Sequence, residues 1–161
     1  MCLRGPWFMV GSLVLGVLAC AARPPPVALS VPDAEGALIA IPEHGAKATV
    51  LEFWSLTCEP CEKSVPALEA ERASLDKLGV RVWFVAVVEA PSEAEPCRAK
   101  LASWGVGGSF LLDVDGGLLQ RLGLSGLPAA IVLDAEGRVS ARFSGRAELG
   151  EIVEAARDAA D

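Results

Sequence analysis

Residues 53–68 read FWSLTCEPCEKSVPAL and place two cysteines, Cys58 and Cys61, two residues apart. An almost continuous apolar run, residues 48–54, comes before the pair and predicts a strand that is buried on both faces of a sheet. Apolar residues then recur with helical spacing over residues 59–78, and a glycine follows. We therefore expect the cysteines where a buried strand gives way to a long helix.

Three roles are possible for this cysteine pair: zinc binding, a structural disulfide and thiol–disulfide exchange. A structural zinc ion needs four ligands, and within the expected domain only Cys97 and His44 remain to complete the set. A static disulfide across so short a loop would constrain little of the unfolded chain. Thiol–disulfide exchange is favoured, because a helix N-terminus stabilises a thiolate and lowers the pKa of a cysteine from about 8.5. We expect no metal, and no cofactor other than a redox-active Cys58–Cys61 disulfide.

The place of each cysteine predicts its role. Cys58 lies at the helix entry and should be the exposed nucleophile. Cys61 lies one turn inside, so it should be shielded until a mixed disulfide forms on Cys58, and should then resolve it. Pro60 suits the first turn of a helix, where its missing N–H costs nothing. Glu59 adds a negative charge that should oppose thiolate formation.

The rest of the sequence predicts an α/β domain. The other expected elements are a short edge strand at 37–42, a strand at 80–88, a helix at 92–104, a strand at 109–113, a short helix at 116–124, a hairpin within 128–145 and a C-terminal helix from residue 147. Two buried strands that flank a long helix favour a right-handed parallel crossover, and the hairpin adds antiparallel strands. The expected architecture is a central mixed sheet flanked by helices.

Two motifs resemble those of thioredoxin-fold proteins, and most closely the TlpA/ResA-like group of exported, membrane-tethered members. The first is the cysteine pair, with Trp54 four residues before it and a proline five residues after it. The second is LSGLPAAIVLDAEGRVSARFSG, residues 124–145, in which Pro128 takes the place of the family's cis-proline. In this family a helix and a strand, here 92–104 and 109–113, are inserted before the strand that follows the cis-proline.

The resemblance covers about residues 31–161 and implies a thioredoxin-like fold and a thiol–disulfide oxidoreductase. Its substrates would be disulfides of exported proteins, as in cytochrome maturation, and a membrane thiol reductase would supply electrons. A cis-proline would expose the backbone of Leu127 to an incoming extended peptide. The residues expected to bind substrate are Trp54, Thr57, Pro60, Leu127 and Pro128. Thr57 replaces the tryptophan that relatives generally carry there, which makes the rim more polar.

Three residues outside the motifs carry further expectations. Glu52 falls where thioredoxins have a buried acid. It is either a general base for Cys61, with a pKa raised by burial, or an exposed residue on a short solvated face. Cys97 falls on an apolar helical stripe and is expected to be an inert core cysteine, with a third redox partner as the alternative. Trp83 is expected in the core.

Two other functions stay open. A peroxiredoxin-like thiol peroxidase is weakly suggested by a Thr-Cys pair after an apolar strand, although Trp54 and Ser55 stand where that family keeps other residues. A copper-delivery protein of the same fold would need a wider cysteine spacing and a distal histidine. Rapid peroxide consumption would favour the first alternative, and stoichiometric copper binding would favour the second.

The N-terminus predicts export. Residues 1–19 place Arg4 before a short apolar run, as in a signal peptide. The following VLAC motif resembles the bacterial lipobox, in which Cys20 would be lipidated. Cleavage after an Ala-x-Ala triplet, or an uncleaved anchor, are the alternatives, and each exports the chain. Residues 20–36 are rich in proline and are expected to form a tether, which leaves residues 37–161 as the folded domain.

The composition supports one acidic domain. The chain has 161 residues, of which 52% are hydrophobic, and its net charge is −7. This is enough apolar material for one core without structural disulfides. No Lys/Arg-rich run is present, which argues against a nucleic-acid partner. The expected location is the periplasmic side of a membrane, to which the chain itself would be anchored as a lipoprotein.

Overall fold

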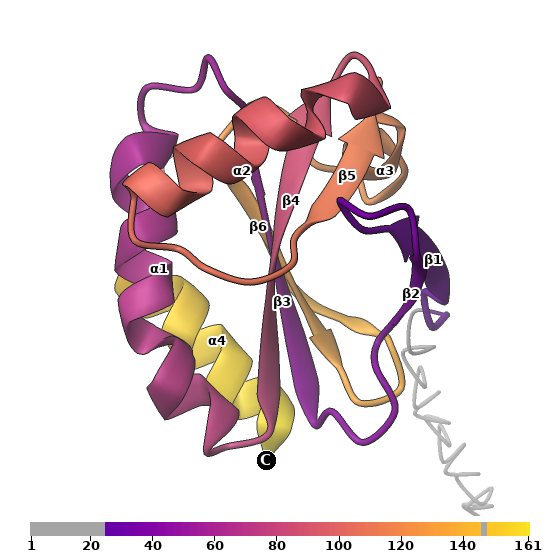
Figure 1. The fold of residues 1–161 in the computed structure, drawn as a ribbon. Coiled ribbons are helices and arrows are strands. Elements are labelled where there is room, and N and C mark those ends of the chain that lie inside the picture. Colours follow the sequence, from indigo (N-terminus) through magenta and orange to yellow (C-terminus); the bar gives the residue numbers. More distant parts are fainter. Residues whose placement is uncertain (1–24, 146–147) are drawn as a thin grey trace, which may run out of the picture.

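The computed structural model describes residues 25–145 and 148–161, and a mixed sheet in the order β5-β4-β3-β6-β7 forms its centre (Figure 1). The strands are β3 (Ala48–Trp54), β4 (Val80–Val88), β5 (Leu111–Val114), β6 (Ala129–Asp134) and β7 (Val139–Ser144). The β3, β4 and β5 strands are parallel, whereas β6 runs antiparallel to β3 and to β7. This is the predicted α/β arrangement, and every residue of the central β3 is buried.

Helices cover the two faces of the sheet unequally. The helices are α1 (Cys61–Asp76), α2 (Ala94–Ser103), α3 (Gly117–Arg121) and α4 (Leu149–Ala160), and a 3₁₀ turn (Pro91–Glu93) leads into α2. Buried side chains of α1, α2 and α4 share one core with β3, β4 and β6. A second core lies on the opposite face of the sheet, where α3 packs together with a hairpin. In Figure 1 the sheet is seen between α1 and α4 on one side and the hairpin on the other.

That hairpin corrects the predicted domain boundary. It consists of β1 (Leu29–Pro32) and β2 (Leu38–Ile41), and a bridge from Asp33 to Leu111 attaches it to β5. Residues 29–36 were expected in the tether of residues 20–36, but Leu29 and Val31 are buried in the core with Ile41. The domain therefore begins before residue 29. The strand expected at 37–42 belongs to this hairpin and not to an edge of the central sheet.

Candidate functional site

The two cysteines lie at the junction of β3 and α1 and form a disulfide. Cys61 is the first residue of α1 and is fully buried, whereas Cys58 precedes the helix and is partly exposed. Pro60 caps the helix with helical backbone angles, so its missing N–H removes no helical hydrogen bond. The Cys61 N–H donates to the Cys58 carbonyl oxygen, at 3.1 Å. The predicted contrast between an accessible and a shielded cysteine is present.

Pro128 lies beside this junction. The Leu127–Pro128 peptide bond is cis, as predicted. The strand that follows, β6, pairs Ala129 with Phe53, so Pro128 lies next to the end of β3 from which the cysteine segment leaves. A second cis bond, Ile41–Pro42, was not predicted.

Glu52 is buried beneath the junction. It lies on β3 opposite Ala130 and is 1% exposed, so the alternative of a solvated position is wrong. Burial is the largest influence on its carboxyl and raises the pKa from 4.5 to about 7. Both side chains line a cavity of about 10 Å³ that Pro128 and Gly145 help to enclose. A cavity of this size holds roughly one water molecule.

Trp54 supports the site from below. Its side chain is fully buried, so its expected place among the substrate-binding residues is corrected: no part of the ring can reach a partner at the surface. The ring meets that of Trp104 edge to face, with centroids 5.2 Å apart and an interplanar angle of 65°. The other residues expected to bind substrate differ in exposure. Thr57 and Pro60 are exposed, Leu127 is half-buried and Pro128 is buried.

Ser64 and Trp104 were not predicted at the site, although Trp104 was expected on the apolar stripe of Cys97. Ser64 lies three residues after Cys61, which on a helix is nearly one turn, so a polar residue at this spacing was an available signal. Trp104 follows α2 and reaches the site only through packing between elements distant in sequence. No local pattern could have placed it against Trp54.

Cys97 is the one free cysteine within residues 25–145 and 148–161, and it is fully buried on α2. Burial raises the pKa of its thiol to about 11, and the negative charge of Glu93 acts in the same direction. The expectation of a core cysteine is confirmed. In the described part of the chain, no group of three or more His, Cys, Asp or Glu side chains is arranged to hold a metal ion.

Residues 25–142 match the AhpC/TSA family. The chain belongs to this family. It is also similar to the thiol-disulfide oxidoreductase ResA of Bacillus subtilis, with 29% identity over 107 residues, which are 66% of this chain and 58% of the relative. The chain spans 58 to 65% of the length of the ResA proteins of Bacillus subtilis, Geobacillus thermodenitrificans and Bacillus thuringiensis. The predicted resemblance to the ResA-like group is confirmed.

Solved structures share the fold. StoA from Bacillus subtilis has a TM-score of 0.66 and 21% identity, over 81% of this chain and 97% of that one. The pneumococcal exposed lipoprotein thioredoxin Etrx1, from Streptococcus pneumoniae, has a TM-score of 0.65 and 20% identity, over 82% of this chain and 99% of that one. The thioredoxin-like fold is therefore confirmed.

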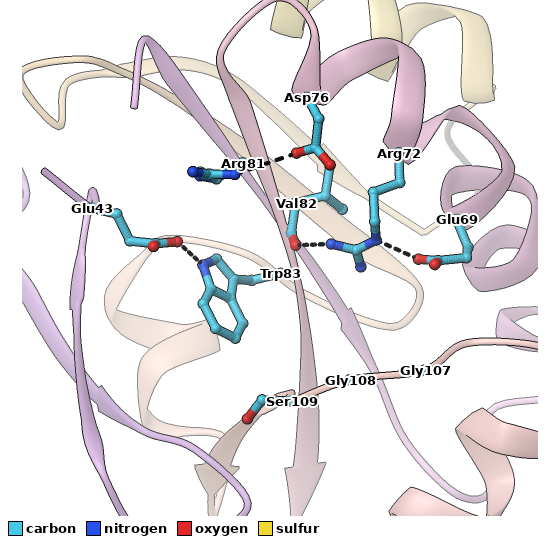
Figure 2. A pocket seen from close by; sticks show the side chains of 10 residues that line it. All are labelled: Glu43, Glu69, Arg72, Asp76, Arg81, Val82, Trp83, Gly107, Gly108 and Ser109. Atoms are coloured by element: carbon cyan, nitrogen blue, oxygen red, sulfur yellow. Dashed lines mark hydrogen bonds and ion pairs between the residues drawn. The ribbon is translucent and has the colours of Figure 1, made fainter. Parts of the chain in front are cut away.

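A second hollow, of about 320 Å³, lies beside the first half of β4 (Figure 2). The β5 strand pairs only with residues 85–88 of β4, and no other described strand covers residues 80–84 on that side. Arg72 covers the edge instead, since its Nη1 donates to the Val82 carbonyl oxygen at 2.7 Å. Trp83, expected in the core, is only half-buried here, and its Nε1 donates to Glu43.

Four of the five charged residues around this hollow are paired with one another. Arg72 pairs with Glu69, and Arg81 pairs with Asp76 (Figure 2). Glu43, the remaining charged residue of the lining, accepts from the neutral Trp83 indole and has no ion-pair partner among the described residues.

Proposed function

We propose that this chain is an extracytoplasmic thiol–disulfide oxidoreductase that reduces disulfides of exported proteins through Cys58 and Cys61. The observation that carries the proposal is the disulfide between a partly exposed Cys58 and a buried Cys61 at the N-terminus of α1. The similarity to ResA, which is named a thiol-disulfide oxidoreductase, supports the same activity.

The reaction moves two electrons in two exchanges. The Cys58 thiolate attacks one sulfur of a substrate disulfide, so that the substrate S–S bond breaks and a mixed disulfide forms on Cys58. The substrate sulfur that leaves takes up a proton. The Cys61 thiolate then attacks the Cys58 sulfur, which forms the Cys58–Cys61 disulfide and releases the second substrate thiol. A dithiol donor outside the domain must reduce the pair again, because disulfides persist in an oxidising compartment.

Glu52 supplies the proton acceptor for the second exchange. The Cys61 thiol must lose its proton before it attacks, and it is buried. A carboxyl with a pKa of about 7 can take up or release that proton near neutral pH. The small cavity that Glu52 shares with Ser64 has room for one water molecule between the carboxyl and the helix.

The location of the chain is part of this proposal. We assign residues 1–19 to a signal peptide, Cys20 to a lipid anchor and a membrane thiol reductase to the role of electron donor. Residues 1–24 lie outside the described residues, so this part rests on the sequence. Pneumococcal Etrx1 is an exposed lipoprotein thioredoxin, and it supports this location by analogy. In the described ranges, no helix is both long and apolar enough to cross a membrane.

The test is a redox titration of the full chain in detergent, in glutathione buffers of known poise, read by alkylation and mass spectrometry. Cys58 and Cys61 should convert together. A potential near or below about −250 mV supports a reductant, whereas one near about −120 mV identifies a disulfide donor and overturns the proposed direction. Rapid peroxide consumption by a pair that does not exchange with glutathione would favour the peroxidase instead.

A further inference from the structure

The end of α2 is attached to the beginning of α1 through Lys100. The Lys100 ammonium donates to Glu62 Oε1 at 2.7 Å, and it lies 5.1 Å from the ring centroid of Trp104. Trp104 in turn contacts the buried Trp54 beneath the cysteines. Figure 1 shows this end of α2 beside the upper end of α1. One lysine thus joins the inserted helix to both the redox helix and the aromatic pair below the site.

Glu62 is the residue through which this contact can affect the chemistry. It follows Cys61 directly, in the first turn of α1. A negative charge at this position favours the helix through its dipole but repels a thiolate forming on Cys58. The other charged side chains of this segment are Glu59 and Lys63, both exposed, with the carboxyl of Glu52 buried below. Of these, only Glu62 is paired in the described structure with a residue of another element.

We propose that Lys100 is a positioning residue that sets the reduction potential of the Cys58–Cys61 pair by neutralising Glu62. This inference rests on the proposed function and assigns a role to the inserted helix in it. The ion pair is only partly buried, with side chains 31% and 49% exposed, so its effect on stability should be small. Its effect on a nearby thiolate is electrostatic and needs no change in packing.

The electrostatic role predicts opposite effects for the two partners. In Lys100→Gln, an uncompensated Glu62 should destabilise the Cys58 thiolate, and hence the reduced form. In Glu62→Gln, the ammonium is left without its partner carboxylate and should stabilise the thiolate. A loss of packing between α2 and α1 would instead shift both single variants in the same direction. The sign of the effect therefore separates the two roles.

The experiment measures the equilibrium constant for oxidation of the full chain by glutathione disulfide, in detergent. In this reaction the Cys58–Cys61 dithiol and one glutathione disulfide give the protein disulfide and two glutathione thiols. Lys100→Gln should raise this constant by about two- to threefold, or about 9 to 14 mV toward a more negative potential. Glu62→Gln should lower it by a similar factor, and the double variant should return close to wild type. The alkylation rate of Cys58 should fall in Lys100→Gln and rise in Glu62→Gln.

Arg98→Gln is the matched control. Arg98 is also on α2 and also forms exposed ion pairs, but its partners are Glu95 on α2 itself and Glu35 in the turn of the β1–β2 hairpin. This variant should leave the equilibrium constant and the alkylation rate unchanged. In 1 M salt, the shifts of the Lys100 and Glu62 variants should shrink, because exposed charges are screened.

The outcomes separate this inference from the proposed function. If the wild-type pair does not exchange reversibly with glutathione, the proposed function fails, and the inference fails with it. If the wild-type pair exchanges but the two single variants shift in the same direction, or neither shifts, only the role of Lys100 is overturned. Equal shifts in Arg98→Gln would also overturn it, since the effect would then not depend on Glu62.

Discussion

The Glu52 carboxyl and the Ser64 hydroxyl face the same small cavity, one from β3 and the other from α1. Among the described residues, neither Glu52 Oε2 nor Ser64 Oγ has a hydrogen-bond partner, although both atoms are buried. A buried polar atom without a hydrogen-bond partner lowers the stability of the folded chain, and such atoms are kept where a functional site needs them. Pro128 lines the same cavity, and Ser64 lies three residues after Cys61 on α1, which links this cost to the redox site.

Glu52 should make the stability of the oxidised protein depend on pH. Its pKa is 4.5 in the unfolded chain and about 7 in the folded chain. At pH values between these two, the folded chain keeps a proton on Glu52 that the unfolded chain has released. The contribution of the protonated carboxyl to the free energy of unfolding is therefore complete below pH 4.5. It is lost as the pH rises through 7, and the total loss is about 3 kcal/mol. Urea unfolding of the oxidised full chain at pH 5 and pH 8 should measure about 2.5 kcal/mol of this difference.

Glu52→Gln is the matched variant for that measurement. Its amide does not titrate, so the difference in stability between pH 5 and pH 8 should shrink by about 2.5 kcal/mol relative to wild type. The variant should also resolve mixed disulfides more slowly near neutral pH, because the proton acceptor is lost. An unchanged pH dependence of unfolding in Glu52→Gln would contradict the assignment of this titration to Glu52.

The two cysteines should differ when each is replaced. Cys58→Ser should abolish disulfide reduction, because the accessible nucleophile is lost. Cys61→Ser should accumulate mixed disulfides with substrate, because Cys58 still attacks and nothing resolves the product. Non-reducing electrophoresis of the variants after incubation with an oxidised model peptide measures this. Equal trapping by both variants would contradict the division of roles.

Cys97 should be inert in the folded chain. Its thiol is fully buried and its pKa is raised to about 11, so alkylation should require unfolding. Cys97→Ala should leave the reduction potential of the pair unchanged, whereas Cys97→Ser should lower the free energy of unfolding by about 1 to 3 kcal/mol by burying an unpaired hydroxyl. Native-state labelling of Cys97 at the rate of Cys58 would restore the alternative of a third redox partner.

Most of the central sheet could be predicted from the sequence because its strands are buried on both faces. The expected ranges 48–54 and 80–88 coincide with β3 and β4, since continuous apolar runs leave little choice of structure. The β1–β2 hairpin was missed because its strands are four residues long and follow a run of prolines that resembles a linker. Its burial depends on contacts with β5 that local sequence does not encode.

The residues of the candidate site also divide into those that the sequence predicts and those that it does not. The cysteine pair and Pro128 follow from motifs, and the burial of Glu52 follows from its place on a central strand. Lys100 and Trp104 could not be inferred, because their contacts with α1 and β3 exist only once the inserted helix has packed. The alternative that Glu52 is exposed to solvent rested on its charge alone. It is wrong because a strand buried on both faces has no side that faces solvent.

Arg72 should stabilise the open edge of β4. Its guanidinium donates to the Val82 carbonyl oxygen, pairs with Glu69 and lies 5.2 Å from the centroid of the Phe84 ring. Arg72→Ala should lower the free energy of unfolding by about 1 to 3 kcal/mol and leave an unpaired strand edge that promotes aggregation. Urea unfolding and light scattering measure the two effects.

Arg72→Lys is the control, because a single ammonium keeps the charge but loses the planar fork that reaches both partners of the guanidinium. It should unfold at a urea concentration between those of wild type and Arg72→Ala. Neither variant should change the reduction potential of the cysteines, because the hollow lies beside the first half of β4 and the disulfide follows the far end of β3. A shift of that potential in Arg72→Ala would mean that the edge of β4 and the redox site are coupled.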